Sequence, residues 1–480
     1  MTAQTAAERV LITSLQFVEA DFAGRVGTQL MRRGHAVAHV THSRLAARRL
    51  RRTGAEVWCL PELMASLAPV DVDAEVERMS AAYAVPTFRD VYSADLVCEG
   101  ADERWALERT VRHLLGMEQV FDAFSPTAVV PEVGNETIRT AAHLVGLRRG
   151  VPVLFLLNTI FDDPLRLNVD ELQAPIVEPG DLRPLTDAER AEVRAFTERF
   201  LARDKPIRAY RDLGVRAERF RVLARHLAVR LLVERDNEYL RPLAWIGNDI
   251  KGRARARLAR VLYEDSAGER PFLYFPLHVW DDYKLKKLIP HRADQLAIVE
   301  VVARALPHGY DLVVKEHPNS IGRNRFLDLL AMRRLGNVRV VQPRFSSNEL
   351  IRRSAGVVAI SSTVGIEALL QHKRVMTLGK PYYAGAGVTR DLYSLAELRT
   401  ELPAFVDAPV DADRIDRFLH AAMRATRPGA PVLIDRSDEN AAALAGSLEA
   451  ALAQRQASRR SASRQSAAVS MLSDASESTR

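Results

Sequence analysis

Three short polar clusters in the second half of the chain carry residue types that suit the binding of a phosphate. They are Lys-Glu-His-Pro at 315–318, Ser-Ser-Thr-Val-Gly-Ile-Glu at 361–367 and Gly-Lys-Pro at 379–381. Each cluster directly follows a short apolar run typical of a buried strand. Because the carboxyl ends of parallel strands line one crevice, the clusters are expected to face a common ligand. Hydroxyl residues at 361–363 would also cap a helix beginning near Val364, an arrangement that favours an anion.

Alternating strands and helices would position these clusters. The first part of the chain predicts strands at 10–15, 36–40, 56–60, 127–130 and 151–157, helices at 45–52, 103–124 and 137–149, a polar turn at 16–21 before a helix near Phe22, and a long polar loop at 158–168. The second part predicts strands at 272–277, 311–314, 338–342, 356–360 and 375–378 and helices at 293–306, 325–335, 347–354 and 439–456. This rhythm predicts an α/β fold with two Rossmann-like doubly wound domains. The expected divisions are an N-terminal domain at 1–184, a helical basic connecting segment at 185–268, a C-terminal domain at 269–456 and a disordered tail at 457–480.

Composition favours a folded cytoplasmic protein. The chain has 480 residues, of which 47% are hydrophobic, and no apolar run reaches the roughly 18 residues that a membrane span needs. Its two cysteines, Cys59 and Cys98, are too few for a disulfide framework or a zinc site. The glycines at 24 and 27 come too late after the first strand to form a dinucleotide fingerprint, which argues against a nicotinamide cofactor.

Positive charge is concentrated in the segment 203–260, which holds 16 basic and 7 acidic residues. Solvated helix faces with ion pairs are the simplest interpretation. The functional alternative is a peripheral contact with an anionic membrane at the inner face, or with an anionic acceptor. Nucleic acid is not expected as a partner, because no binding motif or aromatic stacking platform accompanies the charge.

The three clusters, in this order and spacing, resemble the bacterial capsular polysaccharide biosynthesis family, which includes transferases of the sugar acid Kdo. The segments 153–167 and 275–282 are also similar to that family, and the resemblance covers roughly 127–383. It implies a GT-B fold, with two Rossmann-like domains across a cleft, and a CMP-sugar donor used without a catalytic metal or other cofactor. The chain departs from the family at His278, where a glutamine is expected.

Donor-side roles follow from the chemistry of such a transfer. The departing phosphate needs stabilisation, for which His317 is the candidate, with hydroxyl groups as a cradle and Glu367 binding the ribose hydroxyls. The predicted nucleotide-binding residues are Lys315, His317, Pro318, Ser361, Ser362, Thr363 and Glu367.

Carboxylates are needed at the sugar carbon and at the acceptor hydroxyl. Asp281 and Asp282 follow the first strand of the second domain and are the leading catalytic candidates, together with His317 and Glu132. The predicted acceptor-side residues are Asp21, Asn135, Glu136 and Asn158. Two Asp-x-Asp triplets, at 71–73 and 411–413, are assigned as helix caps and not as metal ligands.

The sequence therefore predicts a glycosyltransferase of surface polysaccharide synthesis, with a nucleotide sugar and a glycan or glycolipid acceptor as partners. Three alternatives stay open. A CDP-glycerol-type glycerophosphotransferase would leave phosphorus in its product, and a UDP-sugar 2-epimerase would need no acceptor. A scaffold without catalysis would bind nucleotide or membrane through its basic helices.

Overall fold

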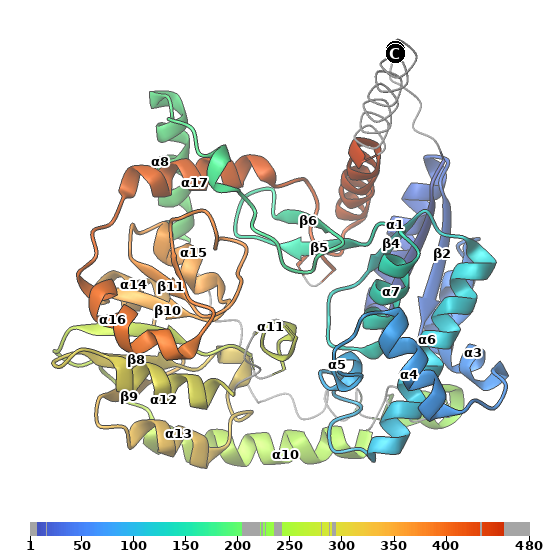
Figure 1. The fold of residues 1–480 in the computed structure, drawn as a ribbon, viewed down its shortest axis with the longest axis horizontal. Helices are drawn as coiled ribbons and strands as arrows, with labels where there is room; N and C mark the ends of the chain where they lie inside the picture. Colours follow the sequence, from blue (N-terminus) through green and yellow to red (C-terminus); the bar gives the residue numbers. More distant parts are fainter. Residues whose placement is uncertain are drawn as a thin grey trace, which may run out of the picture.

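The computed structural model describes residues 7–15, 17–203, 221, 224–225, 227–234, 242–279, 281–287, 289, 294–432 and 434–455. These residues form two α/β halves that lie side by side (Figure 1). The predicted tail at 457–480 and much of the basic segment lie outside the described residues. Among the described residues, no helix combines the length and the apolar character needed to cross a bilayer.

The N-terminal half is built on a parallel sheet in the order β3-β2-β1-β4. Its strands are β1 (Arg9–Ser14), β2 (Ala36–Thr41), β3 (Glu56–Cys59) and β4 (Ala128–Pro131), and β5 (Leu154–Asn158) lies beside β4. Its helices are α1 (Phe17–Arg32), α2 (Arg44–Arg51), α3 (Leu60–Ser66), α4 (Val72–Ala82), α5 (Arg89–Tyr92), α6 (Glu103–Phe124) and α7 (Thr137–Arg148). Buried apolar residues pack on both faces of the sheet, which explains why its strands are apolar runs without alternation.

Two predictions for this half are wrong. Helix α1 begins at Phe17, so residues 17–21 are helical and do not form a turn. The predicted loop at 158–168 contains a strand, β6 (Leu165–Val169), which pairs antiparallel with β5 as a hairpin. The apolar residues at 165, 167 and 169 alternate with Arg166 and Asn168 in the sequence, and this alternation is the signal that was missed. In the structure both polar residues are buried and Val169 is exposed.

The C-terminal half contains a parallel sheet in the order β12-β11-β10-β7-β8-β9. Its strands are β7 (Phe272–Pro276), β8 (Asp311–Lys315), β9 (Val338–Val341), β10 (Gly356–Ala359), β11 (Val375–Thr377) and β12 (Arg390–Asp391). Its helices are α11 (Tyr283–Lys286), α12 (Gln295–Ala305), α13 (Phe326–Arg333), α14 (Ser347–Arg353), α15 (Thr363–Leu369), α16 (Leu398–Asp407) and α17 (Ala412–Ala425). In this half's own numbering the strand order is the Rossmann order, with the topological switch point between β7 and β10.

The chain crosses between the halves more often than predicted. Helix α8 (Asp187–Ala202), assigned to the connecting segment, buries Phe196 and Phe200 in the C-terminal half. The last helix, at 438–455, was predicted to close the C-terminal domain. It instead packs Leu444 and Leu448 against Val10 and Phe22 of the N-terminal half, because its apolar face completes the cover of that sheet.

Helix α10 (Pro242–Ala259) runs along one edge of the molecule below both halves (Figure 1). Both Asp-x-Asp triplets are helix caps, as predicted: Asp71 accepts from backbone N–H groups at the start of α4, and Asp411 does so at the start of α17. The predicted fold class is confirmed, with two Rossmann-like doubly wound units of the GT-B type.

Candidate functional site

A cavity of about 1020 Å³ opens at the carboxyl ends of β7, β8 and β10, beside the switch point of the C-terminal sheet. Ligands in doubly wound folds bind at this place. Its lining includes Lys315, His317 and Pro318 from one cluster and Ser362, Thr363 and Glu367 from another. The fold thus brings together two of the predicted polar clusters around one space.

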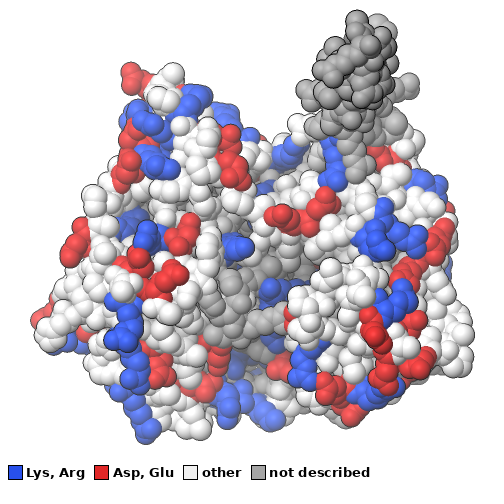
Figure 2. Space-filling view, in the orientation of Figure 1, with Lys and Arg blue, Asp and Glu red and all other residues white. Residues whose placement is uncertain are grey.

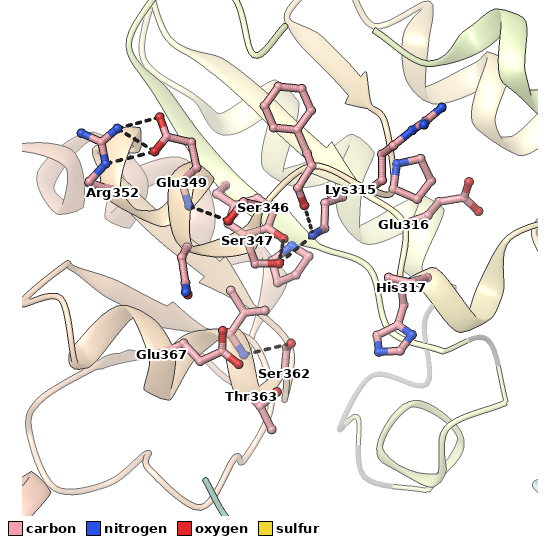
Figure 3. A pocket seen from close by; sticks show the side chains of 18 of the residues that line it. Lys315, Glu316, His317, Ser346, Ser347, Glu349, Arg352, Ser362, Thr363 and Glu367 are labelled. Atoms are coloured by element: carbon pink, nitrogen blue, oxygen red, sulfur yellow. Dashed lines mark hydrogen bonds and ion pairs between the residues drawn. The ribbon is translucent and has the colours of Figure 1, made fainter. Parts of the chain in front are cut away.

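His317 and Lys315 occupy different sides of this cavity. The ring of His317 lies across an open space from Ser362 and Thr363 (Figure 3). Its Nδ1 accepts the N–H of Asn319 at 3.1 Å, so the proton of the neutral ring sits on Nε2. Burial lowers the pKa of His317, which keeps this ring neutral near pH 7. His317 therefore offers an N–H donor.

Lys315 holds the loop after β9. Its Nζ donates to the carbonyl of Phe345 at 2.8 Å and to Oγ of Ser347 at 2.6 Å. Glu316 also lines the cavity, and its carboxylate accepts hydrogen bonds from Tyr263 and Asn324. These two contacts fix the position of Glu316 within its cluster. Burial raises the pKa of the Glu316 carboxyl group.

The Ser-Ser-Thr turn leads from β10 into α15. Ser362 is the N-cap, and its Oγ accepts the N–H of Val364 at 3.2 Å. Thr363 and Glu367 line the cavity, with Glu367 one helical turn further along α15. Ser361 is buried and does not line the cavity among the described residues; its N–H donates to Nε2 of His278 at 3.1 Å.

His278 connects three parts of the site. Because its Nε2 accepts from Ser361, the neutral ring carries its proton on Nδ1, which lies 3.6 Å from Oδ2 of Asp282. Its own N–H donates to Gln295 at 2.8 Å. Burial lowers the pKa of His278. The residue that departs from the family therefore links the ends of β7 and β10 to the start of α11, and it acts as a positioning residue.

Gly365 allows Tyr383 to lie against α15. A Cβ at Gly365 would stand 2.1 Å from Oη of Tyr383, which is fully buried and donates to the carbonyl of Ser362 at 2.5 Å. Replacing Gly365 by Ala is expected to destabilise the fold by about 1–3 kcal/mol and to weaken nucleotide binding. Chemical denaturation and nucleotide titration measure both effects. Gly336→Ala is the matched control, since no atom lies within 4 Å of its Cβ position. Equal stability of the two variants would contradict this packing.

Glu132 lies in the opposite half, directly after β4. Burial and the negative charge of Glu19 raise its pKa to about 7, while Arg139 opposes the shift. Among the described residues its carboxylate has no hydrogen-bond donor. A carboxylate with a pKa near 7 can accept a proton at neutral pH, which is the property of a general base.

An ion-pair network supports the turn between β4 and α7. Buried Arg139 pairs with Glu19 at 3.0 Å and with Glu136 at 3.1 Å, and it donates to the carbonyl of Val133 at 2.6 Å. Gly134 makes room for it, because a Cβ there would stand 2.0 Å from Nη1 of Arg139. These contacts orient the segment that carries Glu132.

Helix α11 carries the C-terminal half into contact with this turn, and Figure 1 shows it between the two halves. Nδ2 of Asn135 donates to the carbonyl of Asp281 at 2.6 Å. Nζ of Lys287 donates to the carbonyl of Gly134 and to Oγ1 of Thr140, both at 2.8 Å. Burial lowers the pKa of Lys287 to about 8. These bonds hold Glu132 on the edge of its sheet that faces the other half.

The remaining predicted residues are placed differently from expectation. Asp282 caps α11 through Oδ1 and faces His278 through Oδ2, so both oxygens are engaged within its own half. Although burial opposes it, the bond from His278 lowers the pKa of Asp282. Asp21 lies within α1 and pairs with Arg49 at 2.7 Å, since the predicted turn is helical. Asn158 is exposed at the end of β5.

Sequence reasoning missed several residues of the site. They are single residues without a local pattern, and only the fold brings them to the cavity or to the interface of the halves: Glu19, Arg139, Lys287, Phe345, Ser347, Asn348 and Gln371. His278 was the exception, because its departure from the family drew attention to it.

Comparisons with known proteins give three relevant likenesses. Protein FixF of Sinorhizobium fredii (strain NBRC 101917 / NGR234) is 34% identical over 118 residues, which span 23% of this chain and 27% of FixF. The beta Kdo 2,7 transferase of Thermosulfurimonas dismutans KpsC is 16% identical, with a TM-score of 0.32, over 63% of this chain and 79% of that one. UDP-GlcNAc 2-epimerase from Neisseria meningitidis is 13% identical, with a TM-score of 0.28, over 90% of this chain and 97% of that one.

A family model described as capsule polysaccharide biosynthesis protein matches residues 220–425. The matched region contains β7 to β12, and with them His278, His317 and the Ser-Ser-Thr turn. The resemblance of this region to the capsule polysaccharide biosynthesis family is thereby confirmed.

Proposed function

We propose that this chain is a glycosyltransferase of surface polysaccharide synthesis that transfers a sugar from a CMP-sugar, with Kdo as the candidate sugar, to a glycan or glycolipid acceptor. The observation that carries the proposal is the arrangement of the cavity. In that cavity His317 faces Ser362 and Thr363 at the switch point of the C-terminal half. Glu132, with a pKa near 7, lies outside the cavity lining, directly after β4, in the turn whose Asn135 contacts the C-terminal half. The family match over 220–425 supports it.

On the donor side, the nucleotide phosphate lies between His317 and the turn at 362–363. Nε2–H of His317 and the hydroxyl groups donate to phosphate oxygens, and the ribose hydroxyls bind Glu367. As the bond between the anomeric carbon and the phosphate oxygen breaks, negative charge builds on the leaving CMP. Donors that are already oriented stabilise this charge without reorganisation.

On the acceptor side, Glu132 accepts the proton of the acceptor hydroxyl. The oxygen of that hydroxyl forms the new bond to the anomeric carbon. CMP leaves with the electrons of the broken bond, so the reaction balances without a metal or another cofactor. Asp282 acts through His278 and α11. Asn135 donates to the backbone carbonyl of Asp281, which places Asp281 at the interface of the two halves.

Incubation with CMP-Kdo and a lipid-linked glycan acceptor tests the proposal. CMP should be released in proportion to a glycosylated product that contains no new phosphorus. A gain of phosphorus by the acceptor would favour a CDP-glycerol-type glycerophosphotransferase. Epimerisation of a UDP-sugar in the absence of an acceptor would favour a UDP-sugar 2-epimerase. Absence of turnover with every CMP-sugar would overturn the proposal.

The acceptor side also includes a proposed contact with an anionic membrane at the cytoplasmic face. Large apolar side chains are exposed along α10 and the turn η4 (Arg260–Leu262): Ile250 is 63%, Leu258 57% and Val261 73% exposed. Their spacing places them on one helical stripe. Lys251, Arg257 and Arg260 are exposed beside this stripe, and Figure 2 shows basic side chains gathered at the lower edge, where α10 runs.

An apolar stripe bordered by cations suits the boundary of an anionic lipid surface. The apolar groups enter the acyl region, and each nearby cation adds about 1 kcal/mol. A lipid-linked acceptor would then meet a protein already held at its membrane.

Leu258→Glu and Val261→Glu are each expected to lower affinity for phosphatidylglycerol vesicles at least tenfold, because burial of an aliphatic side chain is worth about 1.5–3 kcal/mol. Vesicle sedimentation measures this affinity. Ile434→Glu is the control, since Ile434 is 58% exposed on another surface. An equal loss of vesicle affinity in the control variant would contradict the contact. Vesicle affinity that does not depend on salt concentration or on lipid charge would also contradict it.

A further inference from the structure

A carboxylate from a distant part of the chain occupies the start of helix α2. Glu234 ends the helical turn η3 (Arg230–Glu234) of the connecting segment and is 6% exposed. One of its carboxylate oxygens accepts from Oγ of Ser43 at 2.6 Å, and the other accepts from the N–H of Arg44 at 2.7 Å. The N–H of Leu45 also donates to this carboxylate, at 3.3 Å. A side chain 190 residues away in the sequence therefore binds α2 as an anionic ligand.

Two properties of α2 favour an anion at this place. The N–H groups of its first turn have no partner within the helix and lie at the positive end of the helix dipole. The helix also contains four arginines and no acidic residue: Arg44, Arg48, Arg49 and Arg51. Bonds of 2.6 and 2.7 Å to the Glu234 carboxylate have the short length typical of charge-assisted hydrogen bonds. The start of α2 is therefore matched to a negatively charged oxygen group.

The start of α2 lies on the same edge of the N-terminal sheet as Glu132. Strands β2 and β4 both pair in parallel with β1, and their registers place Thr41 and Pro131 at this edge. Glu132 follows Pro131 directly, and Ser43 follows Thr41 by two residues. The ends of β2 and β4 are two inter-strand spacings apart, which is about 10 Å. An anion at the start of α2 thus lies on the acceptor side, near the proposed general base.

Apolar packing contributes little to the attachment of Glu234. Leu231 and Leu232, which precede it in η3, are 67% and 71% exposed. Neither they nor Val233 belong to the hydrophobic clusters formed by the described residues. The contact with α2 is polar, and the carbonyl of Glu234 also accepts from the guanidinium group of Arg44. A segment with few buried apolar contacts detaches at a low cost in free energy, so a competing anion can displace this carboxylate.

We propose that Glu234 is an autoinhibitory ligand of the acceptor side, and that the start of α2 binds the phosphate group of a phosphate-bearing acceptor when Glu234 leaves. A phosphate offers enough oxygen atoms to accept from the Ser43 hydroxyl and from both N–H groups that Glu234 now engages. In the free chain the carboxylate competes with that phosphate and lowers its apparent affinity. The blocking role rests on the proposed function, because the acceptor it excludes is the one that reacts at Glu132.

Calorimetric titration of the full chain with inorganic pyrophosphate tests the anion site. Glu234→Gln keeps the size of the side chain and removes its charge. This variant should bind pyrophosphate about tenfold more tightly than the wild type, because the internal competitor is weakened. Ser43→Ala in the Glu234→Gln background should remove the gain, since Ser43 supplies one of the donors. This second change separates the start of α2 from the cavity at His317.

Asp71→Asn is the matched control. Asp71 accepts from two backbone N–H groups at the start of its own helix, α4, so its replacement should lower stability without raising pyrophosphate affinity. Steady-state kinetics give a second readout: Glu234→Gln should lower KM for a phosphate-bearing acceptor about tenfold and leave kcat unchanged. Its affinity for phosphatidylglycerol vesicles should equal that of the wild type.

Failure of this inference and failure of the proposed function give different results. If Glu234→Gln is less stable and gains no pyrophosphate affinity, Glu234 is only a helix cap, and the inference is overturned while the function stands. An equal gain in Asp71→Asn would overturn it as well. A parallel gain in vesicle affinity would assign the site to a lipid headgroup and overturn the acceptor. If pyrophosphate affinity rises but no CMP-sugar is turned over, the proposed function and the blocking role fail, and the anion site stands.

Discussion

Replacing Glu132 by Gln is expected to lower the turnover of CMP-sugar by 10²–10⁴-fold, the range for loss of a general base. The affinity for CMP should change by less than about threefold, because Glu132 lies in the opposite half from the nucleotide cavity. Steady-state kinetics and CMP titration separate these two quantities. Glu56→Gln is the matched control, since Glu56 is exposed at the opposite end of the same sheet.

The pH profile gives an independent test of the same residue. Burial raises the pKa of Glu132 to about 7, so the carboxylate is protonated below that pH and cannot accept the acceptor's proton. Turnover should therefore fall as the pH drops below about 7, and this acidic limb should be absent in Glu132→Gln.

Stability should change in the opposite direction to activity. The folded-state pKa of Glu132 lies above its ordinary value of 4.5, so the folded protein binds this proton more tightly than the unfolded chain. That stabilisation is present below pH 4.5 and is lost as the pH rises to about 7. At pH 8, Glu132→Gln should unfold at a higher temperature than the wild type. A variant with full activity, or one with reduced stability at pH 8, would contradict the assignment.

Replacing His317 by Ala is expected to lower kcat/KM for the CMP-sugar by about 10²–10³-fold, because it removes one oriented donor to the leaving phosphate. His317→Gln should recover part of this loss, since its amide can donate to the same space. Because burial lowers the pKa of His317, its N–H donor persists through neutral pH, and the variant should retain the acidic limb assigned to Glu132.

His308→Ala provides the control for His317, because His308 is exposed in the turn before β8. The loss of kcat/KM in His317→Ala can be expressed as a free energy and compared with the change in its free energy of unfolding. If the two are equal, His317 acts as a structural cap of its own turn. Its contact with Asn319 makes that alternative measurable by unfolding.

The sequence predicted most elements of this fold because strands buried on both faces leave short, continuous apolar runs. Helix α6 has the predicted bounds, 103–124. The hairpin strand β6 was missed because a short alternation of apolar and polar residues is a weaker signal than a continuous apolar run. The closing helix was recognised, but an amphipathic pattern does not say which sheet its apolar face will cover.

The site was predictable where residues share a strand end and was not where they meet across the halves. His317 and Thr363 were expected together because they follow parallel strands of one sheet. The hydrogen bond between Asn135 and Asp281 joins residues far apart in the chain, and no local sequence pattern predicts it. The same reason explains why Asn348 and Gln371 gave no signal, since isolated amides occur throughout any surface.

Calorimetric titration of the wild-type chain with CMP and UMP, in parallel, tests the central claim most directly. We expect one CMP bound per chain, with higher affinity than UMP, and weaker binding of CMP to His317→Ala. Tighter binding of UMP than of CMP, or binding of neither nucleotide, would contradict the assignment of this cavity to a CMP-sugar.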